Sequence, residues 1–106
     1  MKIPTRLKRI SKKETRPLPV RGLKITEEAG ELAAEILKLV GEKGRRGKTE
    51  REIREHLWLE AVDCAIMSMD ILTHTGATPA DVSRIFNSQL AKWESKMFTE
   101  RTTKKK

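Results

Sequence analysis

The segment LWLEAVDCAIMSM, residues 57–69, is the most apolar part of a chain in which 36% of the residues are charged. Its apolar residues cover a wide arc at helical spacing, so we expect a helix that is contacted on several sides. Two carboxylates, Glu60 and Asp63, lie inside this segment. An ionised carboxylate among apolar neighbours has to be paired, protonated or bound to a cation. The segment therefore predicts a core helix that carries a charged group within it.

The apolar spacing along the rest of the chain predicts two more helices and no strand. One runs over residues 26–40, with Thr26 as N-cap and Gly41 as its stop. The helix that contains the segment above runs over about 49–75. The third helix opens at TPAD, which supplies Thr78 as N-cap, Pro79 at the first helical position and Asp81 at the capping-box position.

The positive charge of the chain, +8 in total, belongs to its two ends. Residues 1–25 hold nine Lys or Arg and one acid, and residues 99–106 hold four and one. The prolines and the absence of periodicity predict a basic irregular arm over residues 1–22. We expect a helical domain over 23–98 and a frayed basic tail over 99–106. Such ends indicate solvated arms, with a nucleic-acid contact as the less favoured alternative.

The predicted fold class is all-α, an antiparallel helical bundle of three main helices. Three helices of this length enclose a thin core, and small domains of this kind are marginal alone. The wide apolar arc of residues 57–69 is also what we expect of a helix that is contacted on several sides. We therefore expect a homo-oligomer, a dimer or a tetramer, to complete the bundle.

Cysteine use and hydropathy indicate a cytoplasmic protein. Cys64 is the only cysteine, so no internal disulfide forms and a reducing compartment fits best. No apolar run has the length that a bilayer crossing needs, so no membrane association is expected. The basic N-terminal stretch lacks the apolar region of a secretory signal.

Paired carboxylates recur on two of the predicted helices. Glu28 and Glu31 are three positions apart and share one side of the first helix, and Glu60 and Asp63 repeat this spacing on the second. Residues 55–83 contain no Lys or Arg, so no base nearby in the sequence neutralises the second pair. Two such pairs facing a shared interior would form an all-oxygen site, which suits Mg²⁺ or Mn²⁺.

The order of these acids has a counterpart in a known family. EEAGE (27–31), 28 intervening residues and EAVD (60–63) resemble the signature of the MazG-like, all-α nucleoside triphosphate pyrophosphohydrolases. The resemblance covers roughly residues 23–98. It implies a Mg²⁺-dependent enzyme that hydrolyses NTP or dNTP between the α- and β-phosphates, releasing a nucleoside monophosphate and pyrophosphate.

The resemblance also implies roles for individual residues. The metal ligands would be Glu28, Glu31, Glu60 and Asp63. Glu27 would add an outer-shell or water-orienting carboxylate to the catalytic set. The family's last helix carries a basic residue and an amide that bind substrate, for which Lys92 with Asn87 or Gln89 is the nearest match. Trp93 either stacks on a base or, as its spacing favours, packs in the core.

Other polar residues have less specific interpretations. Asp70 either binds a second metal or, as we expect, is exposed or caps the helix end, where His74 also suits the helix dipole. His56 could lie at the rim of the site. The loop GEKGRRGK, residues 41–48, lacks the ending of a phosphate-binding P-loop. Its basic residues could still attract polyphosphate electrostatically: Arg45, Arg46 and Lys48.

The N-terminal region departs from the family, whose fuller members have a helix before the first motif. Either the arm folds over the site and brings Arg16, Arg21 or Lys24 to the phosphates, or a neighbouring subunit closes the site. A third interpretation is a bundle that has lost catalysis.

Two further function classes compete with the hydrolase. A carboxylate-bridged dimetal redox bundle needs Glu-x-x-His, but Ile53 and Ile71 stand three positions before the two histidines. A non-enzymatic helical module that binds nucleic acid or a partner through its basic ends remains the alternative.

Overall fold

The chain is described by a computed structural model that covers the backbone of residues 1–41 and 44–104, with side chains up to residue 99 in those ranges. Four helices succeed one another, α1 (Thr5–Lys13), α2 (Leu18–Leu39), α3 (Glu50–His74) and α4 (Pro79–Lys104), and the described residues contain no strand. The predicted all-α class is confirmed. None of the described helices has a stretch long and apolar enough to cross a bilayer.

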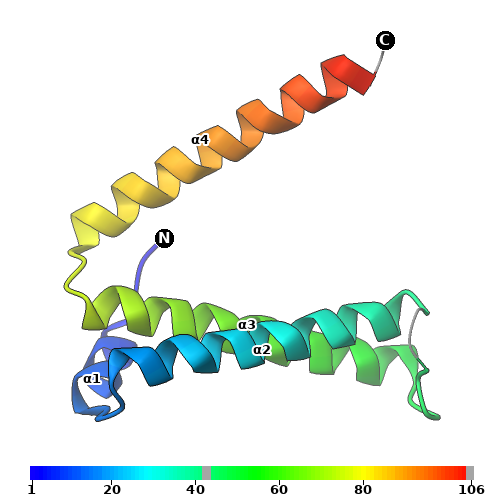
Figure 1. Cartoon of the computed structure of the whole chain (residues 1–106), viewed down its shortest axis with the longest axis horizontal. Helices are drawn as coiled ribbons and strands as arrows, with labels where there is room; N and C mark the ends of the chain where they lie inside the picture. Colours follow the sequence, from blue (N-terminus) through cyan, green and yellow to red (C-terminus); the bar gives the residue numbers. More distant parts are fainter. Residues whose placement is uncertain (42–43, 105–106) are drawn as a thin grey trace.

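Helices α2 and α3 form an antiparallel hairpin that makes up most of the packed interior (Figure 1). The predicted end of α2 is confirmed, because Gly41 takes a left-handed φ of 84° directly after the helix. The predicted bounds of α3 are confirmed as well. Thr49 caps it through a reciprocal pair of hydrogen bonds with Glu52, and Thr75 stands at its C-cap.

The predicted start of α2 is wrong, because the helix begins at Leu18 and not near Thr26. Pro17 and Pro19 stand at the N-cap and in the first turn, where the missing N–H groups would have no helical partner anyway. Thr26 lies inside the helix, and its hydroxyl donates a hydrogen bond to the carbonyl oxygen of Gly22 at 3.4 Å. The prolines therefore start a helix where the sequence pattern indicated a loop.

The irregular arm predicted over residues 1–22 is also wrong. Residues 5–13 form α1, which packs against α3 near the start of α2 (Figure 1). Pro4 stands at its N-cap position, and the chain turns extended at Glu14. Ile3 and Ser11 are buried, and the Ser11 hydroxyl donates to Asp70 on α3, so this region is part of the folded body.

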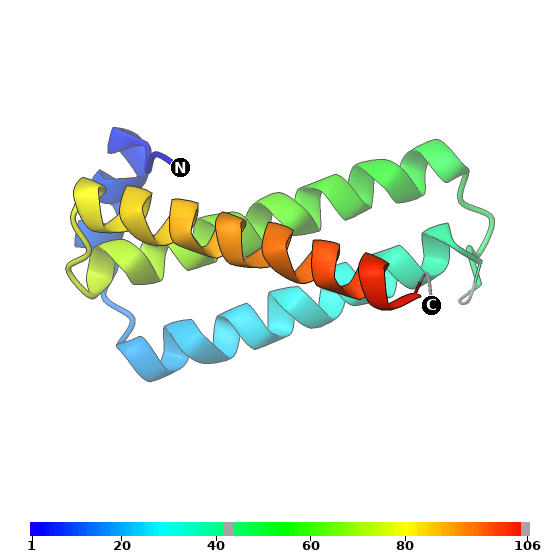
Figure 2. The same ribbon diagram turned by 90° about the horizontal axis from the view of Figure 1, so that it is seen from above.

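Helix α4 starts as predicted and then extends away from the hairpin (Figure 1), and it lies over the hairpin when seen from above (Figure 2). The Thr78 hydroxyl accepts from the Asp81 amide at 3.1 Å, and the Asp81 carboxylate accepts from the Thr78 amide at 3.0 Å. The helix continues to Lys104, so the frayed tail predicted from residue 99 is wrong for the backbone. Residues 105–106 and the side chains of 100–104 lie outside the described residues.

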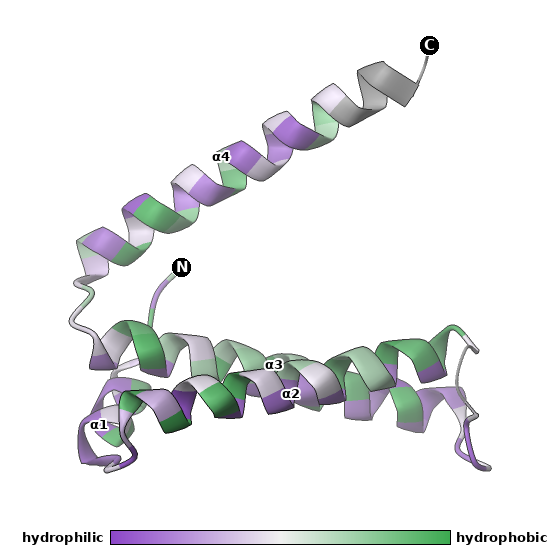
Figure 3. Cartoon of the chain, in the orientation of Figure 1, coloured by the Kyte–Doolittle hydropathy of each residue, from purple (hydrophilic) through white to green (hydrophobic). Residues whose placement is uncertain are grey.

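Most of the apolar residues of α4 are exposed. Figure 3 shows apolar positions distributed along the helix, and the following are exposed: Ile85, Phe86, Leu90, Trp93, Met97 and Phe98. Of the apolar stripe that helical spacing predicts on this helix, Val82 is buried, whereas the exposed residues named above do not enter a core of the same chain. Extensive helix packing among the described residues is confined to α2 with α3 and α1 with α3.

The dimensions of the chain agree with this open arrangement. Its radius of gyration is 17.3 Å, whereas a compact chain of this length has about 13 Å. Its solvent-accessible area is 8336 Å², whereas a folded monomer of 12.1 kDa exposes about 6,000 Å². The predicted three-helix bundle is therefore not closed within one chain.

Candidate functional site

The middle of the hairpin brings together three of the four predicted carboxylate ligands. Glu28 on α2 is buried, with 8% of its surface exposed. Because α2 and α3 run antiparallel, it faces Glu60 and Asp63 on α3, and one carboxylate oxygen from each of these three residues lies within 4.8 Å of the others. This juxtaposition joins residues about thirty positions apart in the chain. We call Glu28, Glu31, Glu60 and Asp63 the acidic cluster.

Glu60 occupies the most perturbed position in the acidic cluster. Burial and the carboxylates of Glu31 and Glu28 raise its pKa to about 7, because all of them disfavour a further negative charge. Its Oε2 atom is buried and accepts no hydrogen bond from any described residue. A buried carboxylate oxygen without a donor is costly unless a proton or a cation satisfies it. The cluster therefore has the electrostatics of a site that attracts cations.

The cluster has limited neutralisation from within the chain. Lys24, one turn before Glu28, places its Nζ 3.4 Å from the Glu28 carboxylate and 3.6 Å from that of Glu27. Among the described residues, no ion pair reaches Glu31, Glu60 or Asp63. One lysine thus compensates only part of the charge of four carboxylates.

The remaining predicted catalytic acids occupy the edge of this arrangement. Glu31 is exposed and lies outside the close group of three, although it is near enough to raise the pKa of Glu60. Glu27 is exposed on the outer side of α2 and pairs with Lys24. Glu35, one turn beyond Glu31, is buried and pairs with Lys38 at 3.0 Å.

Asp70 has a structural role that the sequence did not predict. Its Oδ1 accepts hydrogen bonds from Arg21 at 2.8 Å and from the Ser11 hydroxyl at 2.5 Å, so it is neither exposed nor a helix cap. Arg21 is buried and also donates to the carbonyl oxygens of Glu14 and Arg16, at 3.0 and 2.8 Å. The guanidinium proposed for phosphate contact is thus committed to joining α1, α2 and α3. No local pattern marks a pair 49 positions apart.

The predicted substrate-binding residues on α4 do not meet the acidic cluster within one chain. Lys92, Asn87 and Gln89 are exposed on a helix that extends away from the hairpin (Figure 1). Trp93 is 65% exposed, so the core position favoured by its spacing is wrong for the isolated chain.

The other titratable residues agree with their local surroundings. His74 lies in the last turn of α3, as predicted, and His56 is exposed in the first half of the same helix. Cys64 has no disulfide partner and is half-buried, and burial with the neighbouring acids raises the pKa of its thiol.

The comparisons with known proteins add no relative. No family model matches the chain, and no match was found among curated proteins or solved structures. The likeness to MazG-like enzymes therefore rests on the two carboxylate motifs and on the way the hairpin brings them together.

Proposed function

We propose that this chain is a MazG-like, Mg²⁺-dependent nucleoside triphosphate pyrophosphohydrolase, which converts NTP or dNTP to a nucleoside monophosphate and pyrophosphate. The observation that carries the proposal is the convergence of Glu28, Glu60 and Asp63, with ligand atoms within 4.8 Å of one another. These are three of the four metal ligands that the two motifs imply. The fourth, Glu31, lies beside Glu60.

The donor set supports a hard divalent cation. All the candidate ligand atoms are carboxylate oxygens, which Mg²⁺ and Mn²⁺ prefer, and the buried Glu60 Oε2 lacks a donor among the described residues. A bound Mg²⁺ would polarise the phosphate and activate water for hydrolysis. Glu28, Glu60 and Asp63 would hold it, while Lys24 would keep the Glu28 side chain in place.

A second copy of the chain belongs to the same proposal. Each chain exposes roughly 2,300 Å² more surface than a compact monomer of its mass, which is the scale of a large obligate interface. Exposed apolar residues lie on α4, along α3 at Trp58, Leu59, Val62 and Ile66, and also on α2. A dimer or tetramer that covers both faces would bring an α4 to the hairpin and with it the predicted substrate-binding residues.

The test is a panel of ribo- and deoxyribonucleoside triphosphates with Mg²⁺, assayed for pyrophosphate release. We expect release from at least one nucleotide, and a loss of at least about 100-fold in kcat/KM in Glu60→Gln and in Asp63→Asn. Glu55→Gln is the matched control, because Glu55 is an exposed acid of α3 whose ion-pair partner among the described residues is Arg51. No pyrophosphate from any nucleotide, or full activity in both site variants, would exclude the proposal.

One observation favours the second candidate function, a module that binds nucleic acid. Basic residues of α1 line a shallow surface pocket together with Thr5: Lys8, Arg9, Lys12 and Lys13. Contacts of lysine and arginine with phosphates make binding steeply dependent on salt. A short RNA or DNA duplex that binds with such a dependence, and loses it in Lys12→Gln with Lys13→Gln, would support this candidate.

A further inference from the structure

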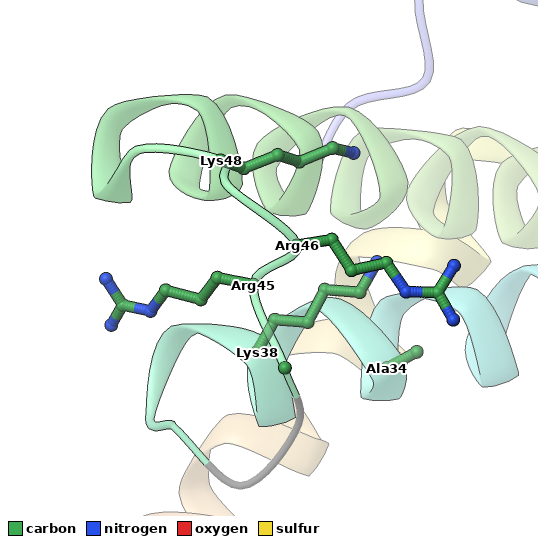
Figure 4. A pocket seen from close by; sticks show the side chains of 6 residues that line it. Ala34, Lys38, Arg45, Arg46 and Lys48 are labelled. Carbon is green, nitrogen blue, oxygen red and sulfur yellow. The ribbon is translucent and has the colours of Figure 1, made fainter.

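A basic pocket lies at the end of the hairpin where α2 turns into α3. It has a volume of about 570 Å³ and is lined by Ala34, Lys38, Gly44, Arg45, Arg46 and Lys48. In Figure 4, Lys38 and Arg46 extend along α2 to the side of Ala34, Lys48 runs parallel to them over α3, and Arg45 points away. Three cations from a helix and a loop thus line one side of the cavity.

The cations differ in what already neutralises them. Arg45 donates to the carbonyl oxygen of Leu39 at 2.9 Å, which compensates the partial negative charge at the end of α2. Lys38 pairs with Glu35. Arg46 and Lys48 form no ion pair with any described residue. Lys48 helps to lower the pKa of the Glu52 carboxyl, but from beyond ion-pair distance. Arg46 and Lys48 are therefore cations of the basic pocket that no described carboxylate pairs with.

The loop backbone holds these two residues in place. Arg46 takes a φ of 51° and Gly47 one of 79°, so two successive residues are left-handed. The Lys48 amide donates to the carbonyl oxygen of Arg45 at 3.1 Å and closes this turn. The turn directs the Arg46 side chain back over α2 (Figure 4).

The basic pocket begins one helical turn beyond the acidic cluster on α2. Ala34 and Lys38 come three and seven positions after Glu31, so they lie on its side of the helix. The helical rise places the Cα of Lys38 about 10 Å beyond that of Glu31, and the basic side chains extend back across this interval. A chain of linked phosphates that starts at the acidic cluster can reach these cations.

We propose that the basic pocket binds a polyphosphate group, the terminal phosphates of the nucleotide whose first phosphate lies at the acidic cluster. The assignment to a nucleotide rests on the proposed function. Polyphosphate binding itself rests on the pocket alone. Arg46 and Lys48 are the substrate-positioning residues, since arginine and lysine form strong charge-assisted hydrogen bonds with phosphate oxygens.

The binding test uses inorganic tripolyphosphate, titrated by calorimetry into the full chain in EDTA so that no metal bridges the two. We expect the variant Arg46→Asn with Lys48→Gln to bind at least about tenfold more weakly than the natural chain. Asn tolerates the left-handed conformation, and an unchanged melting temperature will show that the variant folds. Arg84→Ala, which removes a charge at the start of α4, and Glu60→Gln are expected to retain binding.

Three results would overturn the proposal. The first is that tripolyphosphate binds the natural chain and the double variant equally well. The second is that Arg84→Ala loses as much binding as the double variant. The third is that a short RNA binds the natural chain more tightly than tripolyphosphate does and is weakened by the same double variant. Hydrolysis supplies an independent readout. If the chain hydrolyses a nucleotide but the double variant keeps its KM, the pocket assignment fails and the proposed function stands. If tripolyphosphate binding depends on the pocket but no nucleotide is hydrolysed, the pocket stands as a polyphosphate site and the proposed function fails.

Discussion

Replacing Arg21 by Met should destabilise the chain severely. Only 2% of Arg21 is exposed, and its guanidinium donates to Asp70 and to two backbone carbonyl oxygens, all within 2.8–3.0 Å. Met has a similar length and no charge, so the variant leaves the largely buried Asp70 carboxylate with the Ser11 hydroxyl alone. Removing one partner of a buried ion pair costs about 3–5 kcal/mol.

The assay is thermal unfolding, monitored by circular dichroism. Unfolding entropy of about 2.1 cal/mol/K per residue, over 106 residues, converts that loss to a fall in Tm of roughly 13–22 °C. Hydrogen exchange should show the largest loss of protection in α1, because Arg21 and Asp70 join α1 to the hairpin. Arg54→Met is the control, since Arg54 and Glu50 form an exposed pair at 3.4 Å that contributes less than about 1 kcal/mol.

A second variant separates the charge effect from lost packing. Adding Asp70→Leu to Arg21→Met removes the unpaired carboxylate, so at least about 2 kcal/mol should be regained. A fall in Tm no larger than that of Arg54→Met would refute this account of the pair. So would a double variant less stable than Arg21→Met alone.

Three further perturbations test other parts of the fold. In metal-free protein, folded Glu60 keeps its proton up to about pH 7 while the unfolded chain releases it near 4.5, so stability should fall as pH rises through this window. Glu60→Gln should remove that fall from the plot of melting temperature against pH, and parallel plots for the variant and the natural chain would contradict the expectation. Thr49→Ala deletes the capping box of α3 and should cost about 1 kcal/mol in denaturant unfolding, whereas no change would show that the cap is dispensable. Leu90→Glu on the exposed apolar side of α4 should convert an oligomer to monomers, as measured by light scattering, whereas Ser88→Glu on the opposite side should not. Equal masses for the two variants would count against α4 as the interface.

The features that the sequence predicted well are those with local causes. Each helix boundary that was confirmed depends on residues within four positions, as at Thr49, Gly41 and Thr78. The prolines led to the wrong prediction of an irregular arm over residues 1–22, because Pro is compatible with a loop and equally with the first turn of a helix. Only the residues after Pro19 could distinguish a loop from a helix there, and their apolar spacing was weak.

The sequence predicted that acids of α2 and α3 would face each other, but it did not predict how far each acid takes part. Spacing placed Glu60 and Asp63 on one side of α3, and antiparallel packing made Glu28 their neighbour. The lesser involvement of Glu31 depends on the rotation of α2 about its axis, which no pattern in one chain specifies. The position of α4 was missed because an apolar stripe predicts burial without saying which chain supplies the partner.

The absence of Lys and Arg from residues 55–83 leads to two different outcomes on the same helix. Opposite Asp70, α2 supplies Arg21, and the carboxylate becomes a fixed part of the fold. Opposite Glu60, α2 supplies Glu28 and Glu31, and the carboxylate is left with a raised pKa and a buried oxygen that has no donor among the described residues. An ion pair satisfied within the chain needs nothing more, whereas the second arrangement is satisfied only by a proton or an added cation. The residue that α2 places opposite an acid of α3 thus decides whether that acid is a structural carboxylate or a candidate ligand. This contrast favours metal binding at the acidic cluster and not at Asp70.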